Sequence, residues 1–279
     1  MATEVVNRLV FSDPDATYSA REGNVSSNLH SWCPSLQKFN HSNSTVLFCF
    51  PFAGGGASAF GNWAVTFGDR ITICPIQYPG RETRWSEPEF EKLSALVDDL
   101  ADAFENYWPS RFAFLGHSFG ALVAFELART LMRRGQPTPM RLFLAGARAP
   151  HLLIKEKAHR LSDQDFLDRL RQFNGLPKEL LEHHDLIASV LPIIKNDFRL
   201  FEEHEFKSGN PLAVPLSVFG GLEDLNVSIG DLLGWSIHTS KVFRSRFLKG
   251  HHFFLFSSLP AIATYIKEDL DACSPRDGG

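Results

Sequence analysis

The sequence has no long apolar run, and this excludes several classes of protein. No stretch reaches the roughly 18 apolar residues that a membrane-spanning helix needs. The first residues, Met1–Tyr18, carry Glu4, Asp13 and Asp15 and contain no apolar core, so they do not resemble a secretory signal. We therefore expect a cytoplasmic protein without a membrane partner.

Cysteine is scarce, and basic residues are not in excess. The four cysteines are Cys33, Cys49, Cys74 and Cys273, and their spacing is not that of a metal or redox site. We expect no metal and, in a reducing compartment, buried free thiols. The formal net charge of −4 argues against nucleic acid as the main partner.

The composition and patterning indicate one α/β domain. The chain has 279 residues, of which 44% are hydrophobic and 25 are phenylalanine, enough for one sizeable core. Helical spacing of apolar residues at 89–108 and 119–134 alternates with extended apolar runs, which predicts a parallel sheet covered on both faces. The predicted strands are 45–50, 71–77, 112–116, 141–146, 215–220 and 242–248.

The pentapeptide Gly-His-Ser-Phe-Gly at 116–120 stands between a predicted strand and a predicted helix. A sharp strand-to-helix turn with serine at its apex is a nucleophile elbow, in which glycines allow the turn and the hydroxyl is exposed. The flanking elements make this reading stronger than the five residues alone. We therefore expect Ser118 to be a catalytic nucleophile rather than part of a structural turn.

A nucleophilic serine needs a base and an orienting acid, which follow it along the chain as acid and then histidine. His251 and His252 come directly after the predicted strand 242–248, so we expect the base to be one of this pair. His117, inside the elbow, is expected to be a packing or hydrogen-bonding neighbour.

The acid is expected in a loop that leaves a strand upstream of these histidines. The loop after 215–220 contains Glu223 and Asp224, and we prefer Asp224, with Glu223 as the alternative. The loop at 146–150 is the competing place for an acid, but it contains no carboxylate. This absence supports Asp224.

An oxyanion hole in such an enzyme uses the backbone N–H after the nucleophile, here Phe119, and a second N–H from a loop after an early strand. The strand 45–50 runs into Pro-Phe-Ala-Gly-Gly-Gly at 51–56, where glycines permit close approach of a ligand. A phosphate-binding loop is the alternative, but no Gly-Lys-Ser/Thr follows. We expect Ala53 to supply the second N–H.

Four blocks of the sequence resemble the type II (external) thioesterases that accompany polyketide and non-ribosomal peptide synthases. They are residues 51–58, 78–82, 116–121 and 250–254. The medium-chain thioesterase of animal fatty acid synthase is similar to the same group. The resemblance runs from about Trp32 to Lys267. It implies an α/β-hydrolase fold, with a mostly parallel central sheet, helices on both faces and a helical lid insertion.

The resemblance also implies roles and a substrate. It places the nucleophile at Ser118, the acid at Asp224 and the base at His252, which directly precedes a Phe-Phe pair. It implies hydrolysis of acyl thioesters from the phosphopantetheine arm of acyl or peptidyl carrier proteins, by a monomer without a cofactor of its own. The alternatives are product release from a fatty acid synthase, a general carboxylesterase, and a non-catalytic binding protein of this fold.

The alternation of strands and helices stops between residues 151 and 206. A helix start at Ser162–Asp165 and helical patterns at 178–191 and 193–204 predict a lid that lies above the elbow and either forms an acyl pocket or only packs on the core. We expect the domain to span 29–272, with a partly ordered extension over 1–28 and a flexible tail over 273–279.

Carrier proteins tend to be acidic, so the resemblance also implies a basic rim around the entrance to the site. The candidates, chosen because they lie in loops near strand ends, are Arg81, Arg84, Arg148 and Lys155.

Overall fold

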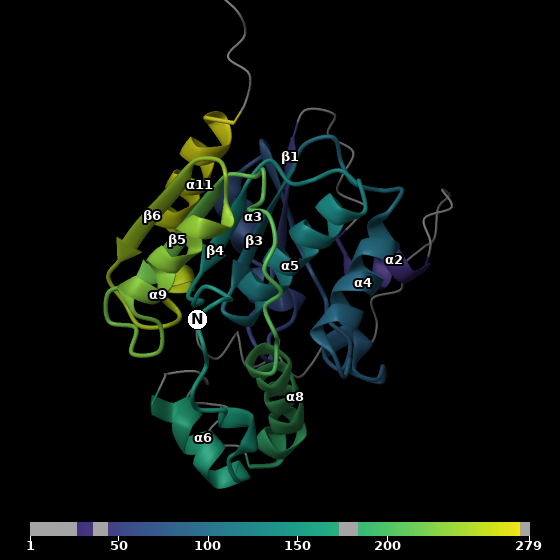
Figure 1. Ribbon diagram of the computed structural model, residues 1–279. Coiled ribbons are helices and arrows are strands. Elements are labelled where there is room, and N and C mark those ends of the chain that lie inside the picture. The colour runs from purple at the N-terminus through teal and green to yellow at the C-terminus, as the bar shows by residue number, and fades with distance from the viewer. Residues whose placement is uncertain (1–26, 36–43, 173–183, 274–279) are drawn as a thin grey trace, which may run out of the picture.

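The computed structural model describes residues 27–35, 44–172 and 184–273 of the chain. In this part of the protein, parallel strands form one sheet in the order β2-β1-β3-β4-β5-β6 (Figure 1). Each strand lies within a residue or two of its predicted bounds. The strands are β1 (Thr45–Phe50), β2 (Ile71–Pro75), β3 (Phe112–His117), β4 (Leu142–Ala145), β5 (Leu216–Gly221) and β6 (Phe243–Leu248).

Helices cover both faces of this sheet, as predicted for the α/β-hydrolase fold. The helices are α2 (Ser27–Trp32), α3 (Trp63–Phe67), α4 (Leu93–Phe104), α5 (Phe119–Arg133), α6 (Asp163–Gln172), α8 (His184–Glu202), α9 (Ile229–Leu233), α10 (Phe254–Ser257) and α11 (Leu259–Asp271). Short 3-10 turns are η2 (Ala57–Phe60), η3 (Glu82–Arg84), η4 (Ala158–Arg160) and η5 (Gly234–His238).

Strand β1 shows how the two faces are separated. Phe48 and Phe50 join the apolar cluster that contains α4 and α5, whereas Leu47 and Cys49 join the cluster that contains α3 and α11. Side chains alternate between the faces of a strand, so both sets are buried only if helices cover both sides. The two clusters hold the sheet rigid beneath the loops at its carboxyl end.

Helix α4 is shorter than the predicted span of 89–108. Phe90 lies before its first turn and stacks on Trp32, with ring centroids 6.2 Å apart, and Trp108 lies beyond its last turn and stacks on Phe112, 5.0 Å away. Both side chains lie in loops, are partly buried and pack against the same apolar cluster as α4, so the apolar pattern extends further than the helix. Helix α5 ends near its predicted stop at Gly135, where φ is +66°.

The predicted lid is present as α6 and α8, which Figure 1 shows as a lobe at one end of the sheet. Two helices separated at Pro192 were expected, and this is wrong, because α8 runs continuously through Pro192. A proline inside a helix costs about 3 kcal/mol. Burial of Leu191 and Ile193 on either side offsets this cost. The lid has its own apolar cluster, made of Phe166, Leu170, Ile187, Leu191 and Ile194.

The expectation of four free thiols is wrong for one pair. Cys33 and Cys74 form a disulfide, with Cα atoms 6.5 Å apart. The segment after α2 packs against the end of β2, where the N–H of Gln77 donates to the Trp32 carbonyl at 2.9 Å. Cys49 is free and buried, as expected. Because disulfides are rare in reducing compartments, cysteine no longer supports a cytoplasmic location, which stays a prediction.

The predictions for the ends of the chain fall largely outside the described residues. Residues 1–26 of the predicted extension and 274–279 of the predicted tail are not described, nor are residues 173–183 of the lid. Among the helices that are described, none combines the length and the apolar character needed to cross a membrane.

A buried carboxylate joins β5, β6 and α11. Asp269 is fully buried and accepts hydrogen bonds from Ser217 at 2.6 Å and from Arg246 at 2.7 and 2.8 Å, and Arg244 also donates to it. Burial opposes ionisation, but the hydrogen bonds from Arg246, Ser217 and Arg244 outweigh it and lower the pKa of Asp269 from 3.8 to about 2.

This pKa predicts an acid-dependent loss of stability. A folded-state pKa below the unfolded value means that the carboxylate stabilises the fold above about pH 4, and that this is lost as pH falls towards about 2. The shift corresponds to about 2 kcal/mol. We expect the difference in unfolding free energy between wild type and Asp269→Asn to shrink by about that amount between about pH 6 and pH 2, measured by urea denaturation. Asp271→Asn, at an exposed position of the same helix, is the matched control. A difference for Asp269→Asn that is constant with pH would contradict the assignment.

Candidate active site

Strand β3 turns into α5 at Ser118, whose φ of +54° and ψ of −117° are strained for a residue with a side chain. A Cβ on Gly116 would lie 2.2 Å from the Gly120 carbonyl oxygen, and one on Gly120 would lie 2.1 Å from the Phe50 carbonyl oxygen. Only glycine fits either position. The N–H of Ser118 donates to the Ala145 carbonyl at 2.8 Å, which fixes the turn against β4. The structure therefore contains a nucleophile elbow where the sequence predicts one.

A cavity of about 730 Å³ lies between the elbow and the lid. The body of the protein contributes four of the expected site residues to its wall, and the lid contributes both apolar and charged side chains. The four site residues are Ser118, Phe119, Ala53 and His252. The apolar lid residues include Leu161, Leu170, Ile194, Phe198 and Phe201, and the charged ones are Lys155, Glu156, Lys157, Arg169 and Glu202. The apolar face of the lid thus lines the cavity and also packs on the core, and its role in binding an acyl chain stays a prediction.

The loops after β5 and β6 bring Asp224 and His252 together. The imidazole Nδ1 of His252 lies 2.8 Å from Oδ2 of Asp224, and Oδ1 of Asp224 accepts the N–H of Asn226 at 2.8 Å. The Asp224 side chain is 1% exposed and that of His252 is 12% exposed. An ionised carboxylate only accepts hydrogen bonds, so Nδ1 carries the proton and Nε2 is left as an acceptor.

The alternative residues, Glu223 and His251, point to solvent. The His251 side chain is 59% exposed, and its Nδ1 lies 3.1 Å from the carbonyl oxygen of Glu223. Neither residue lines the cavity. From the residues alone, either His251 or His252 could be the base, and only the family resemblance favoured His252. Of the two, the structure brings only His252 to the cavity.

His117 is fully buried beside the site, which agrees with its expected role as a neighbour. Its ring centroid lies 5.1 Å from that of His252 and 6.0 Å from that of Phe52. Burial, and then the neighbouring His252, hold the pKa of His117 well below its usual value. A neutral ring at this position adds no charge next to His252.

The two expected oxyanion donors, Ala53 and Phe119, both line the cavity. Phe119 is the first residue of α5, so its N–H has no intrahelical acceptor. Within the described residues, the N–H of Ala53 and the hydroxyl of Ser118 make no hydrogen bond. In enzymes without substrate, catalytic hydrogen bonds are often long and tighten when the substrate binds.

The residues that hold the Ala53 loop in place were not among those predicted from the sequence. Gln77 accepts the N–H of Ala57 at 2.9 Å, and Asp197 of α8 accepts the N–H of Gly54 at 2.7 Å. Asp197 is 143 residues from Gly54 in the chain and sits in an ordinary helical pattern, so no local signal pointed to it.

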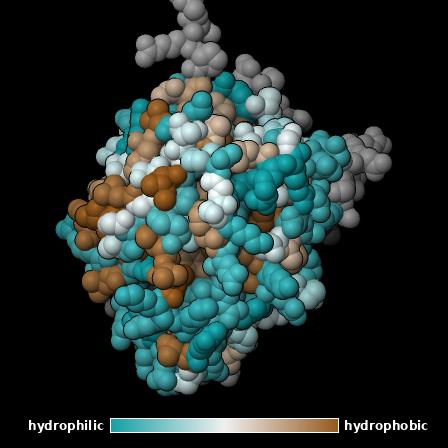
Figure 2. Space-filling view, viewed as in Figure 1, coloured by the Kyte–Doolittle hydropathy of each residue, from teal (hydrophilic) through white to brown (hydrophobic). Residues whose placement is uncertain are grey.

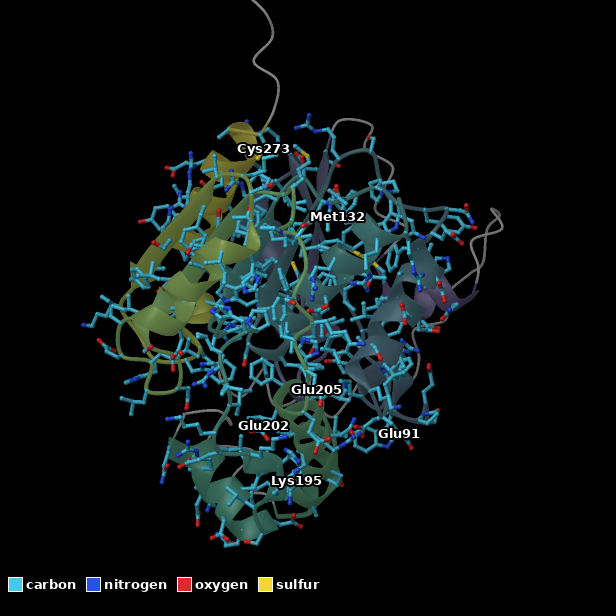
Figure 3. All side chains as sticks on the ribbon, viewed as in Figure 1. Glu91, Met132, Lys195, Glu202, Glu205 and Cys273 are labelled. Carbon is cyan, nitrogen blue, oxygen red and sulfur yellow. A yellow bond between two sulfur atoms is a disulfide. The ribbon has the colours of Figure 1, made fainter. Side chains whose placement is uncertain are left out.

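The predicted basic rim is wrong for Arg81 and Arg84. Both side chains are buried, and Arg81 is paired with Asp197 beneath the lid. A position near a strand end did not reveal that these guanidinium groups face inward. Arg148 and Lys155, in contrast, line the cavity and are partly or largely exposed (Figure 3 shows this region between the sheet and the lid).

Comparisons with known proteins agree with this geometry. Linear gramicidin dehydrogenase LgrE of Brevibacillus parabrevis is 37% identical over 81% of this chain and 88% of its own length. Thioesterase PikA5 of Streptomyces venezuelae is 34% identical over 82% of each chain. The solved structure of RedJ, a thioesterase from the prodiginine pathway of Streptomyces coelicolor, is 34% identical, covers 81% of this chain and 90% of its own, and has a TM-score of 0.77.

One of these names describes a dehydrogenase, whereas the family model describes a different activity. The model "Thioesterase domain" matches residues 45–270, which include the elbow, the lid and the loops that carry Asp224 and His252. The family predicted from the four sequence blocks is confirmed, and the chain belongs to the thioesterase domain family.

Proposed function

We propose that the protein is a type II thioesterase that hydrolyses acyl groups from the phosphopantetheine arm of carrier proteins, with Ser118, His252 and Asp224 as its catalytic residues. The observation that carries this proposal is the hydrogen bond between His252 and Asp224 at a cavity that Ser118 also lines. The elbow, the apolar lid pocket and the family membership support it.

In the first half of the reaction, Ser118 forms an acyl-enzyme. Nε2 of His252 takes the hydroxyl proton as the oxygen attacks the thioester carbonyl. Asp224 holds the Nδ1–H of the imidazole and stabilises the ring when it becomes positively charged. The protonated His252 then gives its proton to the sulfur as the carbon–sulfur bond breaks, and the thiol of the phosphopantetheine arm leaves.

In the second half, water replaces the thiol. His252 takes a proton from water as it attacks the acyl ester on Ser118, and returns it to the serine oxygen when the free acid leaves. In both halves the negative charge on the carbonyl oxygen is stabilised by the N–H groups of Ala53 and Phe119. Loss of one such donor typically costs about 3 kcal/mol of transition-state stabilisation.

The carrier-protein substrate is supported by the names of PikA5 and RedJ, which are thioesterases, the latter from a biosynthetic pathway. The expected role is editing, that is, removal of stalled or misprimed acyl groups. A general carboxylesterase would use the same catalytic residues, so matched thioester and oxygen ester substrates separate the two activities. Mass spectrometry of a panel of acyl carrier proteins, before and after exposure to the enzyme, tests the proposal; unchanged carriers would refute it.

The rim of the cavity has features that suit an acidic carrier protein with apolar contact residues. Arg148 and Lys155 lie on this rim, and Arg148 approaches Asp231 of α9 at 3.9 Å, so α9 borders the same rim. Figure 2 shows apolar side chains gathered over the α9 region. The exposed apolar residues of α9 and of the loops that flank it, residues 222–237, are Leu222, Leu225, Ile229, Leu233 and Ile237.

Reversing the rim charge should weaken carrier binding without changing the chemistry. We expect Arg148→Glu and Lys155→Glu each to raise KM for an acyl carrier protein by roughly tenfold, because a favourable charge contact becomes repulsive. The KM for a small acyl thioester should stay the same. Arg70→Glu is the control. Arg70 is exposed and directly precedes β2, so it lies at the amino end of the strands, whereas the cavity rim lies at their carboxyl end. Equal effects on both substrates would count against recognition of a carrier at this rim.

A further inference from the structure

Helix α8 brings a buried carboxylate to the loop that carries Ala53. The Asp197 side chain is 1% exposed. Its Oδ2 accepts the N–H of Gly54 at 2.7 Å and is also bound by Nη1 of Arg81, while its Oδ1 accepts from Nη2 of Arg81 at 3.1 Å. One carboxylate therefore joins three elements: the lid, the loop after β1 and the loop after β2.

The loop passes directly beneath α8 at Gly54. The φ of Gly54 is +77°, and a Cβ built there would lie 2.4 Å from Cγ1 of Ile194. Ile194 and Phe198, which flank Asp197 on the same face of α8, both line the cavity. The helix face that forms the wall of the acyl pocket is thus also the face that holds the loop.

Asp197 is itself held in a fixed position. Its partner Arg81 is buried, donates from Nε to the Pro79 carbonyl at 3.1 Å, and lies 5.3 Å from the centroid of the Tyr78 ring. A buried ion pair is expensive to break because either partner alone would be an uncompensated charge. The position of Asp197 is therefore set by groups of the protein body, although the residue belongs to the lid.

We propose that Asp197 is a positioning residue for thioester hydrolysis. By binding the N–H of Gly54, it fixes the peptide that follows Ala53, and so fixes the direction of the Ala53 N–H that we assign to the oxyanion hole. Without this bond, a loop of three consecutive glycines has many backbone conformations open to it, whereas an oxyanion donor must lie within a few tenths of an ångström of its place. This inference rests on the proposed function.

The same contact couples the lid to the oxyanion hole. If α8 moves away from the body, Gly54 loses its acceptor and Arg81 loses its counter-charge. The hole is therefore complete only while α8 is seated on the loop, and the lid contributes to the reaction as well as to acyl binding.

Two variants of Asp197 and one control variant test its role. With a small acyl thioester as substrate, Asp197→Ala should lower kcat by roughly 100-fold, as loss of an oxyanion donor does, with little change in KM. Asp197→Asn should restore most of kcat, because its amide oxygen can still accept the N–H of Gly54. The matched control is Asp163→Asn, which removes an exposed ion pair with Lys195 on the outer side of the same lid (Figure 3 labels Lys195) and should leave kcat unchanged.

A double variant separates positioning from folding. Arg81→Met with Asp197→Leu removes both buried charges, so no charge is left unpaired, and such replacements are often tolerated. We expect this variant to have a Tm near that of the wild type and a kcat as low as that of Asp197→Ala. A kcat within about threefold of wild type in the folded double variant would overturn the proposal.

A second readout keeps this test independent of the substrate. A fluorophosphonate that labels Ser118 places its phosphonyl oxygen in the same oxyanion hole, so its labelling rate should fall in Asp197→Ala as kcat does. If the wild type hydrolysed no acyl thioester, the proposed function would fail. Equal labelling rates for wild type and Asp197→Ala would instead overturn the positioning role alone.

Discussion

Ser118→Ala is expected to lower kcat for an acyl thioester by on the order of 10⁶-fold, because nucleophile and base act as a unit. The hydroxyl is the only part of the side chain that is lost, at the edge of a cavity. The backbone of the elbow is fixed by Gly116, Gly120 and the hydrogen bond from the Ser118 N–H, none of which the substitution removes. The variant should therefore keep the Tm and the circular dichroism spectrum of the wild type.

Two outcomes would refute the role of Ser118. The first is activity of the alanine variant within tenfold of wild type, measured by thiol release under single-turnover conditions. The second is labelling of the alanine variant by a fluorophosphonate probe at the wild-type rate, which would place the reactive hydroxyl elsewhere.

The two adjacent histidines allow a matched comparison. We expect His252→Gln to lower kcat by on the order of 10⁶-fold, since it removes the group that carries the proton in every step. His251→Gln should leave kcat within about threefold, because this exposed side chain neither lines the cavity nor contacts Asp224. Steady-state kinetics on one small acyl thioester measures both.

A further variant tests whether serine and histidine belong to one unit. The double variant Ser118→Ala/His252→Gln should be no slower than either single variant, because the second substitution removes a group that has already lost its function. If the two losses multiplied, or if His251→Gln were the inactive variant, the assignment of the base to His252 would be wrong.

The fold could be predicted because its signals are local. Strands buried on both faces appear as continuous apolar runs, and β1 and β3 are the clearest of these. The elbow is also local, since it needs only two glycines and a serine between a strand and a helix. Asp224 followed from the position of its loop and from the absence of a carboxylate at 146–150.

The contacts that the sequence did not reveal are all tertiary. Whether Arg81 faces solvent or Asp197 depends on where α8 crosses the loop after β2, and the two residues are 116 positions apart. The disulfide between Cys33 and Cys74 depends in the same way on how the segment after α2 packs against β2. Choosing His252 over His251 from residues alone would require knowing which face of its loop points to the cavity.

Rapid acid quenching of the enzyme with an acyl carrier protein, followed by mass spectrometry of both proteins, tests whether Ser118 carries the acyl group during the reaction. We expect the acyl mass to pass from the carrier to the peptide that contains Ser118 and then to be released as free acid, leaving the carrier with a free phosphopantetheine thiol. An acyl group that stays on the carrier, or that is transferred to a peptide without Ser118, would contradict it.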